Sequence, residues 1–249
     1  MAKIWLNKID EVYSGDEPWF YEPSNFKWLP AFIEYYHSIE PEVGALFGPQ
    51  SDRYLDYFQD EIQFPPSSWS TISLLSYGME NQSNVEAFSQ LTEHIYKIPG
   101  IVTAYFSRLK PNSHILPHCG PINATLRIHL GLIVPSISPE ECGIKVGNEI
   151  RNWKVGEALA FLDAHQHEAW NRTDEDRVVL ILDVVRPEFM GRKRLICCIM
   201  IFSYALYKML TVLGVKQAAD YLKGKKTTTV LQWIGGITLY PFSFIFLKP

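Results

Sequence analysis

The sequence lacks the features of a secreted protein and of a nucleic-acid-binding protein. Its four cysteines have neither the spacing of a zinc ribbon nor the density of a disulfide scaffold, and the N-terminal MAKIWLNKIDEVYSG has no hydrophobic signal core. We find no internal repeat, no low-complexity segment and no basic stretch interleaved with aromatic residues. We therefore expect a reduced, cytoplasmic protein with no nucleic-acid partner.

Charge is unevenly distributed along the chain. Residues 1–190 carry 14 Lys and Arg against 26 Asp and Glu, whereas residues 191–249 carry 9 against 1. Apolar residues make up 47% of the 249 residues, which is enough to bury one sizeable core. The sequence predicts an acidic domain over 1–190 and a basic, apolar tail over 191–249, and such a tail favours an anionic partner such as a phospholipid surface.

The tail contains two apolar runs, at 195–215 and 230–247. Both approach the ~20 residues that a membrane-spanning helix needs. Lys208 interrupts the first run, and Gly235-Gly236 and Pro241 weaken the second, so helices lying on the membrane or docked on the body are competing interpretations. We expect membrane association of some kind, on the cytoplasmic face.

The spacing of apolar residues predicts helices in the first part of the chain and strands in the part that follows. Residues 25–43 and 84–98 have apolar residues at helical spacing, and Pro99-Gly100 ends the second pattern. Short β-rich runs follow at 101–109, 125–134, 143–147, 150–155, 157–162 and 177–185. The sequence therefore predicts a mainly β fold, with a helical part over 1–100 laid against an antiparallel sandwich over 101–187.

Five polar residues interrupt the β-rich region in a distinctive order. Arg127 and His129 are two residues apart on one strand, so they share a face, and burying them is costly unless they bind something. His118 precedes them, while His167 and Arg177 follow. A lone histidine is more often structural, but two histidines with a carboxylate-binding arginine are what a non-haem Fe(II) oxygenase requires.

The segments around these residues resemble a known family. HCGPINATLRIHLGL and FLDAHQHEAWNRTDEDRVVLILDVVRP are similar to the two signature blocks of the aspartyl/asparaginyl β-hydroxylases, with a match over about 101–187. The resemblance implies a double-stranded β-helix, or jelly-roll, core, and an enzyme that uses Fe(II), the cosubstrate 2-oxoglutarate and O₂. By position, His118 and His167 match the iron ligands, and Ser107, Arg127, His129 and Arg177 match residues that hold 2-oxoglutarate.

Glycine at position 120 sets the expected metal site apart. Most members of the wider oxygenase superfamily have an Asp or Glu two residues after the first histidine, but this family has glycine, as here. We therefore expect an iron site with two protein ligands whose metal affinity depends on chelation by 2-oxoglutarate. Asp163 and Glu168 are the nearest acidic candidates and are expected to support the site, with Glu168 left open as a ligand.

Three functions remain open from the sequence. The signature blocks with Gly120 favour hydroxylation at the β-carbon of an aspartyl or asparaginyl unit in a peptide or small molecule. The basic, apolar tail favours the acyl chain of a membrane lipid, because hydroxylases of lipid A and ornithine lipids also resemble this family. The third interpretation is a non-catalytic module that binds 2-oxoglutarate or a metal.

Overall fold

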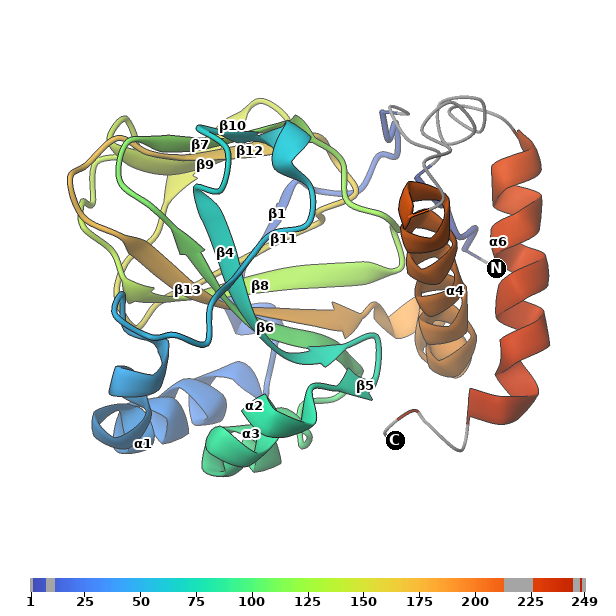
Figure 1. The fold of residues 1–249 in the computed structure, drawn as a ribbon, viewed down its shortest axis with the longest axis horizontal. Helices are drawn as coiled ribbons and strands as arrows, with labels where there is room; N and C mark the ends of the chain where they lie inside the picture. The colour runs from blue at the N-terminus through green and yellow to red at the C-terminus, as the bar shows by residue number, and fades with distance from the viewer. Residues whose placement is uncertain (1, 8–11, 213–225, 244–246, 248–249) are drawn as a thin grey trace.

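Two antiparallel sheets face one another at the centre of the molecule (Figure 1). The computed structural model describes residues 2–7, 12–212, 226–243 and 247. The larger sheet has eight strands, in the order β1 (Phe20–Tyr21), β11 (Ala158–Phe161), β8 (Thr125–Ile133), β13 (Arg177–Val185), β6 (Ile101–Leu109), β4 (Trp69–Ser76) and β2 (Leu55–Asp56), with β5 (Met79–Glu80) paired to β4. The smaller sheet has five, in the order β10 (Glu149–Asn152), β9 (Cys142–Val146), β12 (His167–Asn171), β7 (Ser113–His118) and β3 (Gln63–Phe64).

The connections between the sheets produce a jelly roll. From β6 to β13 the chain passes back and forth between the two sheets, so that β11, β8, β13 and β6 face β10, β9, β12 and β7. Between the sheets lies a cluster of buried side chains that includes Trp69, Trp153, Phe161 and Ile181. The prediction of a mainly β fold with a jelly-roll core is confirmed.

Three helices cover the outer face of the larger sheet (Figure 1). They are α1 (Leu29–Phe47), α2 (Gln82–Ala87) and α3 (Ser89–Ile95). Buried residues of α1 recur every three or four positions, at Leu29, Phe32, Tyr36, Ile39, Val43 and Phe47, as the sequence pattern predicts. The second predicted helix is divided at Phe88, which leaves helical geometry and inserts its fully buried ring against Phe106.

Short 3-10 helices complete the connections. They are η1 (Pro23–Asn25), η2 (Asp60–Ile62), η3 (Pro187–Arg192) and η4 (Tyr240–Phe242). A hairpin turn at Gly147 joins β9 to β10, and Gly147 has the positive φ of 58° that such a turn requires.

The tail forms two helices that lie side by side, α4 (Lys193–Val212) and α6 (Lys226–Leu239) (Figure 1). In α4, Ile196, Cys197, Cys198 and Ile199 are buried in a cluster with Val102, Ile122, Val185 and Phe189 of the body. No helix within the described residues is long and apolar enough to cross a membrane. The 14 residues of α6 rise only about 21 Å, against the ~30 Å of a hydrocarbon core.

Spanning helices were one of the competing interpretations of the tail, and its described part does not contain them. One face of α4 is used for packing on the body, and α6 is too short. The remaining parts of the two apolar runs, at 213–215 and 244–246, and most of the polar stretch between the runs lie outside the described residues.

Candidate active site

The structure brings His118 and His167 together. His118 ends β7 and His167 begins β12, the two are register partners, and their ring centroids are 4.2 Å apart. Nδ1 of His118 lies 2.8 Å from the backbone oxygen of Leu116, and Nδ1 of His167 lies 2.9 Å from that of His165. Because a carbonyl only accepts, each Nδ1 carries the hydrogen, which leaves both Nε2 atoms with lone pairs for a metal.

Burial keeps both imidazoles neutral. It lowers the pKa of His118 to about 4 and the pKa of His167 well below the ordinary value. The charge of Arg127 lowers both pKa values further, and the neighbouring His118 adds to the effect on His167. Neutral imidazole is the form that binds a metal, and a pair of imidazoles suits Fe(II).

Asp163 occupies the space beside Gly120. A Cβ atom on Gly120 would lie 2.3 Å from Oδ2 of Asp163 and 2.8 Å from its backbone oxygen, to which Gly120 N donates at 2.6 Å. Oδ2 of Asp163 is held 3.2 Å from Nη2 of Arg127, and burial raises the pKa of this carboxyl to about 7. Glycine at 120 is therefore a packing requirement, since any side chain here collides with Asp163.

Glu168 is not placed to bind the metal. Its carboxylate lies 2.9 Å from Nε2 of His114 and 3.7 Å from Nζ of Lys145, on the opposite face of β12 from His167, as strand alternation requires. Within the described residues, no group of three or more His, Cys, Asp or Glu side chains could hold a metal ion. In this structure Glu168 therefore lies away from the pair of His118 and His167.

Replacing Gly120 by alanine is expected to lower the free energy of unfolding by about 1–3 kcal/mol, the usual cost of overpacking a core. Asp163 cannot move aside without leaving Arg127. Gly44→Ala in α1 is the matched control, because nothing lies within 4 Å of its added Cβ, and alanine there should stabilise the helix by about 0.5–1 kcal/mol. Urea denaturation of both metal-free variants measures the difference, and equal stability of Gly120→Ala and the parent would contradict it.

Arg177 and His129 present buried hydrogen-bond donors that have no partner among the described residues. Nε and Nη1 of Arg177 have no partner among the described residues, and the guanidinium lies 4.6 Å from the centre of the Trp153 ring. Burial lowers the pKa of Arg177 to about 10, so it keeps its charge at neutral pH. Trp153 Nε1 donates to Nδ1 of His129 at 3.2 Å, so His129 carries its hydrogen on Nε2, which is also buried without a described partner.

These unpartnered donors fit an anionic ligand. Buried polar groups almost always have partners, and an unpaired buried arginine is particularly costly. A dicarboxylate such as 2-oxoglutarate would supply acceptors for Arg177 and for His129. Ser107 accepts a hydrogen bond from Trp69 Nε1 at 2.9 Å, which leaves its own hydroxyl hydrogen to donate to such a ligand.

Arg127 differs from the prediction. It was expected to clamp 2-oxoglutarate, but its Nε and Nη2 donate to the two oxygens of Asp183 at 2.8 and 2.9 Å, and Asp163 lies on its other side. Asp183 is its register partner on β13, a pairing that the sequence does not reveal. The bidentate clamp exists, but it holds the protein's own carboxylates.

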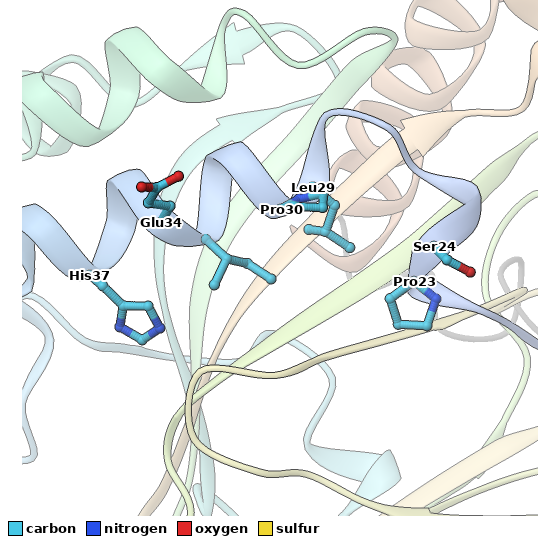
Figure 2. A pocket seen from close by; sticks show the side chains of 7 residues that line it. Pro23, Ser24, Leu29, Pro30, Glu34 and His37 are labelled. Carbon is cyan, nitrogen blue, oxygen red and sulfur yellow. The ribbon is translucent and has the colours of Figure 1, made fainter.

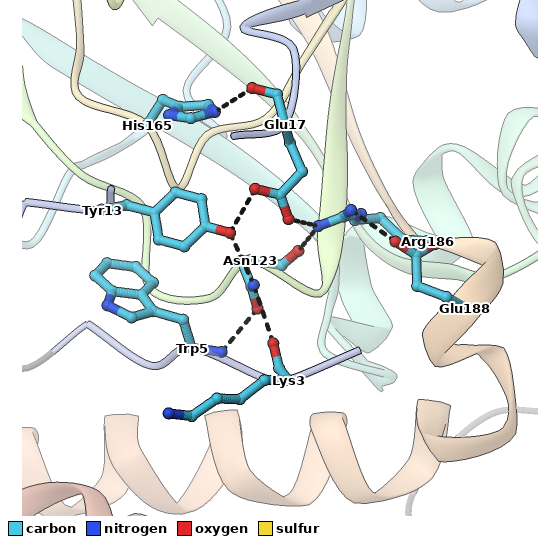
Figure 3. A network of polar contacts seen from close by, with 8 residues as sticks. All are labelled: Lys3, Trp5, Tyr13, Glu17, Asn123, His165, Arg186 and Glu188. Atoms are coloured by element: carbon cyan, nitrogen blue, oxygen red, sulfur yellow. Dashed lines mark hydrogen bonds and ion pairs between the residues drawn. The ribbon is translucent and has the colours of Figure 1, made fainter. Parts of the chain in front are cut away.

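The N-terminal segment bonds to the loop residues beside His118 and His167, a role that no sequence pattern indicates. Asn7 Nδ2 donates at 3.0 Å to the backbone oxygen of Cys119, directly after His118. Nε2 of His165, two residues before His167, lies 2.9 Å from the backbone oxygen of Glu17. Figure 3 shows how the Glu17 side chain continues this network to Tyr13 and Arg186.

Aromatic side chains extend from the histidine pair to the surface at α4. Trp69 lies 6.5 Å from His118 by ring centroids and stacks on Tyr57 at 3.7 Å. The next residue, Phe58, is 41% exposed and contacts Tyr204 of α4 at 5.4 Å. Burial raises the pKa of Tyr57 to about 12, so its hydroxyl remains protonated. We call Trp69, Tyr57, Phe58 and Tyr204 the aromatic path.

A separate surface hollow lies along α1 (Figure 2). It has a volume of about 530 Å³ and is lined mainly by apolar groups of Pro23, Leu29, Pro30 and Ile33, with Glu34 and His37 at its edge. None of the predicted site residues lines it. None of the residues that line this hollow is among the described residues with buried polar atoms that have no hydrogen-bond partner, unlike Arg177 and His129.

Solved structures with a similar fold are distant from this chain. A Pseudomonas putida prolyl-4-hydroxylase matches with a TM-score of 0.37 and 13% identity, over 66% of this chain and 88% of that one. A predicted oxalate decarboxylase from Thermotoga maritima matches with a TM-score of 0.32 and 15% identity, over 47% and 81%. Likenesses this remote carry no argument about the site.

Sequence comparisons are more specific. An ornithine lipid ester-linked acyl 2-hydroxylase of Rhizobium tropici is 37% identical over 190 residues, 74% of this chain and 66% of that protein. The human aspartyl/asparaginyl beta-hydroxylase is 31% identical over 201 residues, 78% of this chain and 26% of that protein, so the chain spans less than two thirds of either relative. The family model for aspartyl/asparaginyl beta-hydroxylase matches residues 34–187. This chain belongs to the aspartyl/asparaginyl β-hydroxylase family.

Proposed function

We propose that this protein is an Fe(II)- and 2-oxoglutarate-dependent hydroxylase that acts on the acyl chain of a polar membrane lipid. The observation that carries the cofactor assignment is the set of buried donors on Arg177 and His129 that have no partner in the described part of the chain, in the same interior as two neutral histidines. A structural arginine would have a partner, whereas an arginine that receives a carboxylate needs to be free.

Five residues of the site would bind the metal and the cosubstrate. His118 and His167 would hold Fe(II) through Nε2, and Arg177, His129 and Ser107 would hold the carboxylates of 2-oxoglutarate. Together with O₂, the bound group supplies the oxidant for hydroxylating an unactivated C–H bond. The chain itself orients the reactants and excludes water, because the walls are Trp69, Trp153 and Phe161.

The choice of an acyl chain as substrate rests on the apolar side chains around the histidine pair and on the pairing of Arg127 with the protein's own carboxylates. A substrate with an aspartyl side chain needs a cation for its carboxylate, but Arg127 is already shared by Asp163 and Asp183. The aromatic path offers an apolar approach to His118 that suits an acyl chain. The similarity to an ornithine lipid acyl 2-hydroxylase over 74% of the chain also supports an acyl chain as substrate. The proposal therefore ranks a lipid above the aspartyl or asparaginyl substrate that the signature blocks favoured.

Hydroxylation at the β-carbon of an aspartyl or asparaginyl unit is the second candidate. The observation that favours it is the similarity to the human aspartyl/asparaginyl beta-hydroxylase over 78% of the chain. In this case Arg177 would still bind 2-oxoglutarate, and the substrate carboxylate would have to displace Asp163 or Asp183 from Arg127.

Incubation of the purified protein with Fe(II), 2-oxoglutarate and either ornithine lipid or an aspartyl peptide distinguishes the candidates. Succinate formation coupled to a gain of one oxygen atom in the lipid supports the proposal, and the same gain in the peptide alone supports the second candidate. Binding of 2-oxoglutarate without succinate, with either substrate, would identify a non-catalytic module and overturn both.

A further inference from the structure

Three large aliphatic side chains are exposed along one face of α6. Leu231, Ile234 and Ile237 are 41%, 56% and 58% exposed, and Phe242, just beyond the helix, is 57% exposed. Their spacing of three residues places them on one side of the helix. We call Leu231, Ile234 and Ile237 the α6 stripe.

The opposite side of α6 is fixed to the body through α4. A Cβ atom on Gly235 would lie 2.2 Å from the Phe202 ring, and one on Gly236 would lie 2.3 Å from the Ile199 side chain. This close approach holds the two helices side by side (Figure 1). Because Gly235 and Gly236 are buried against α4, the α6 stripe points away from it.

Charge complementarity identifies the occupant of this face. Four lysines, at 216, 223, 225 and 226, precede or begin α6 in the sequence, and residues 191–249 carry 9 basic residues against 1 acidic residue. A second copy of the chain would bring two such tails together and would be opposed by their charge. An anionic bilayer attracts the lysines and accepts the apolar side chains.

We propose that the α6 stripe docks the protein on an anionic lipid bilayer, with α6 lying parallel to the membrane surface. Over its 14 described residues α6 is too short to cross the hydrocarbon core, and an apolar stripe that lysines precede in the sequence is the pattern of an interfacial helix. The same α4 that supports α6 also carries Tyr204, so docking brings a lipid surface to the element at the outer end of the aromatic path. The inference extends the proposed lipid substrate but does not depend on turnover.

Cosedimentation of the full chain with vesicles tests this docking. The protein should bind vesicles of phosphatidylglycerol and phosphatidylcholine, bind phosphatidylcholine alone much more weakly, and lose affinity as salt rises. Changing Leu231, Ile234 and Ile237 together to glutamine should lower the partition coefficient at least about tenfold. The matched control changes three exposed aliphatic residues elsewhere, Ile137, Ile150 and Val155, to glutamine and should bind within about twofold of the parent.

Circular dichroism and melting temperature verify that both triple variants remain folded, and the single change Ile234→Gln provides a milder second variant. Equal vesicle binding by the parent and the α6 stripe variant would overturn the proposal, as would binding that is indifferent to lipid charge. Light scattering provides another contrary outcome: a parent that dimerises through the stripe and does not bind vesicles. Since only binding is measured, failure here is distinguishable from absence of hydroxylase activity.

Discussion

Replacing Arg177 by methionine is expected to raise the dissociation constant of 2-oxoglutarate about 100-fold or more, since charge-assisted hydrogen bonds contribute about 1.5–3 kcal/mol each. The same change should stabilise the ligand-free protein by about 1–3 kcal/mol, because it removes a buried charge whose Nε and Nη1 have no described partner. Calorimetric titration with 2-oxoglutarate and urea denaturation measure the two effects. Opposite signs for binding and stability are the signature of a residue reserved for a ligand.

Arg127→Met is the control, because it removes a largely buried guanidinium, 13% exposed, that is already paired. Its loss leaves Asp163 and Asp183 buried without a counter-ion, which should cost about 3–5 kcal/mol of stability. If Arg177→Met is as destabilising as Arg127→Met, Arg177 is a structural residue and the proposed 2-oxoglutarate site is wrong.

Changing His167 to alanine is expected to lower iron-dependent succinate formation at least about 100-fold, because even residues that merely orient a metal ligand cost 10–100-fold when removed. The fold should survive, since His167 lies at the first position of β12 and its Nδ1 bonds to the nearby backbone oxygen of His165. Bound iron, measured after desalting, should fall together with succinate.

His114→Gln is the control for a general effect of losing a histidine from this sheet. His114 is on β7 like His118, but it faces outward and contacts Glu168. This variant should retain iron and activity. Turnover in His167→Ala comparable to the parent would show that the two-histidine assignment is incorrect.

The strands that carry pure apolar patterns were predictable, and those that carry the histidines were not. β6 and β13 begin and end where the sequence predicts, because nearly all of their residues are buried on both faces. β7 and β12 contain histidine, proline and acidic residues in only six and five positions, so no periodic signal identifies them. Helix 84–98 was predicted as continuous because apolar spacing does not reveal that Phe88 leaves the helix to fill the core.

The sequence identified the histidines and arginines of the candidate site, but not the side chains that contact them. His118, His167, His129 and Arg177 stand out because histidine and arginine are conspicuous among apolar strands. The tryptophans that surround them, Trp69 and Trp153, do not stand out, because aromatic residues are common throughout this chain. The role of Arg127 was missed because only the strand register places Asp183 opposite it.

The buried face of α4 limits where the chain can be truncated. The charge pattern changes sign near Gly191, but Ile196, Cys197 and Ile199 lie in one cluster with Val102, Ile122 and Phe189. Cutting the chain at the charge boundary would expose this apolar patch to water and promote aggregation. The change in charge marks where the surface chemistry changes, whereas the buried cluster continues past it through α4 to Leu247.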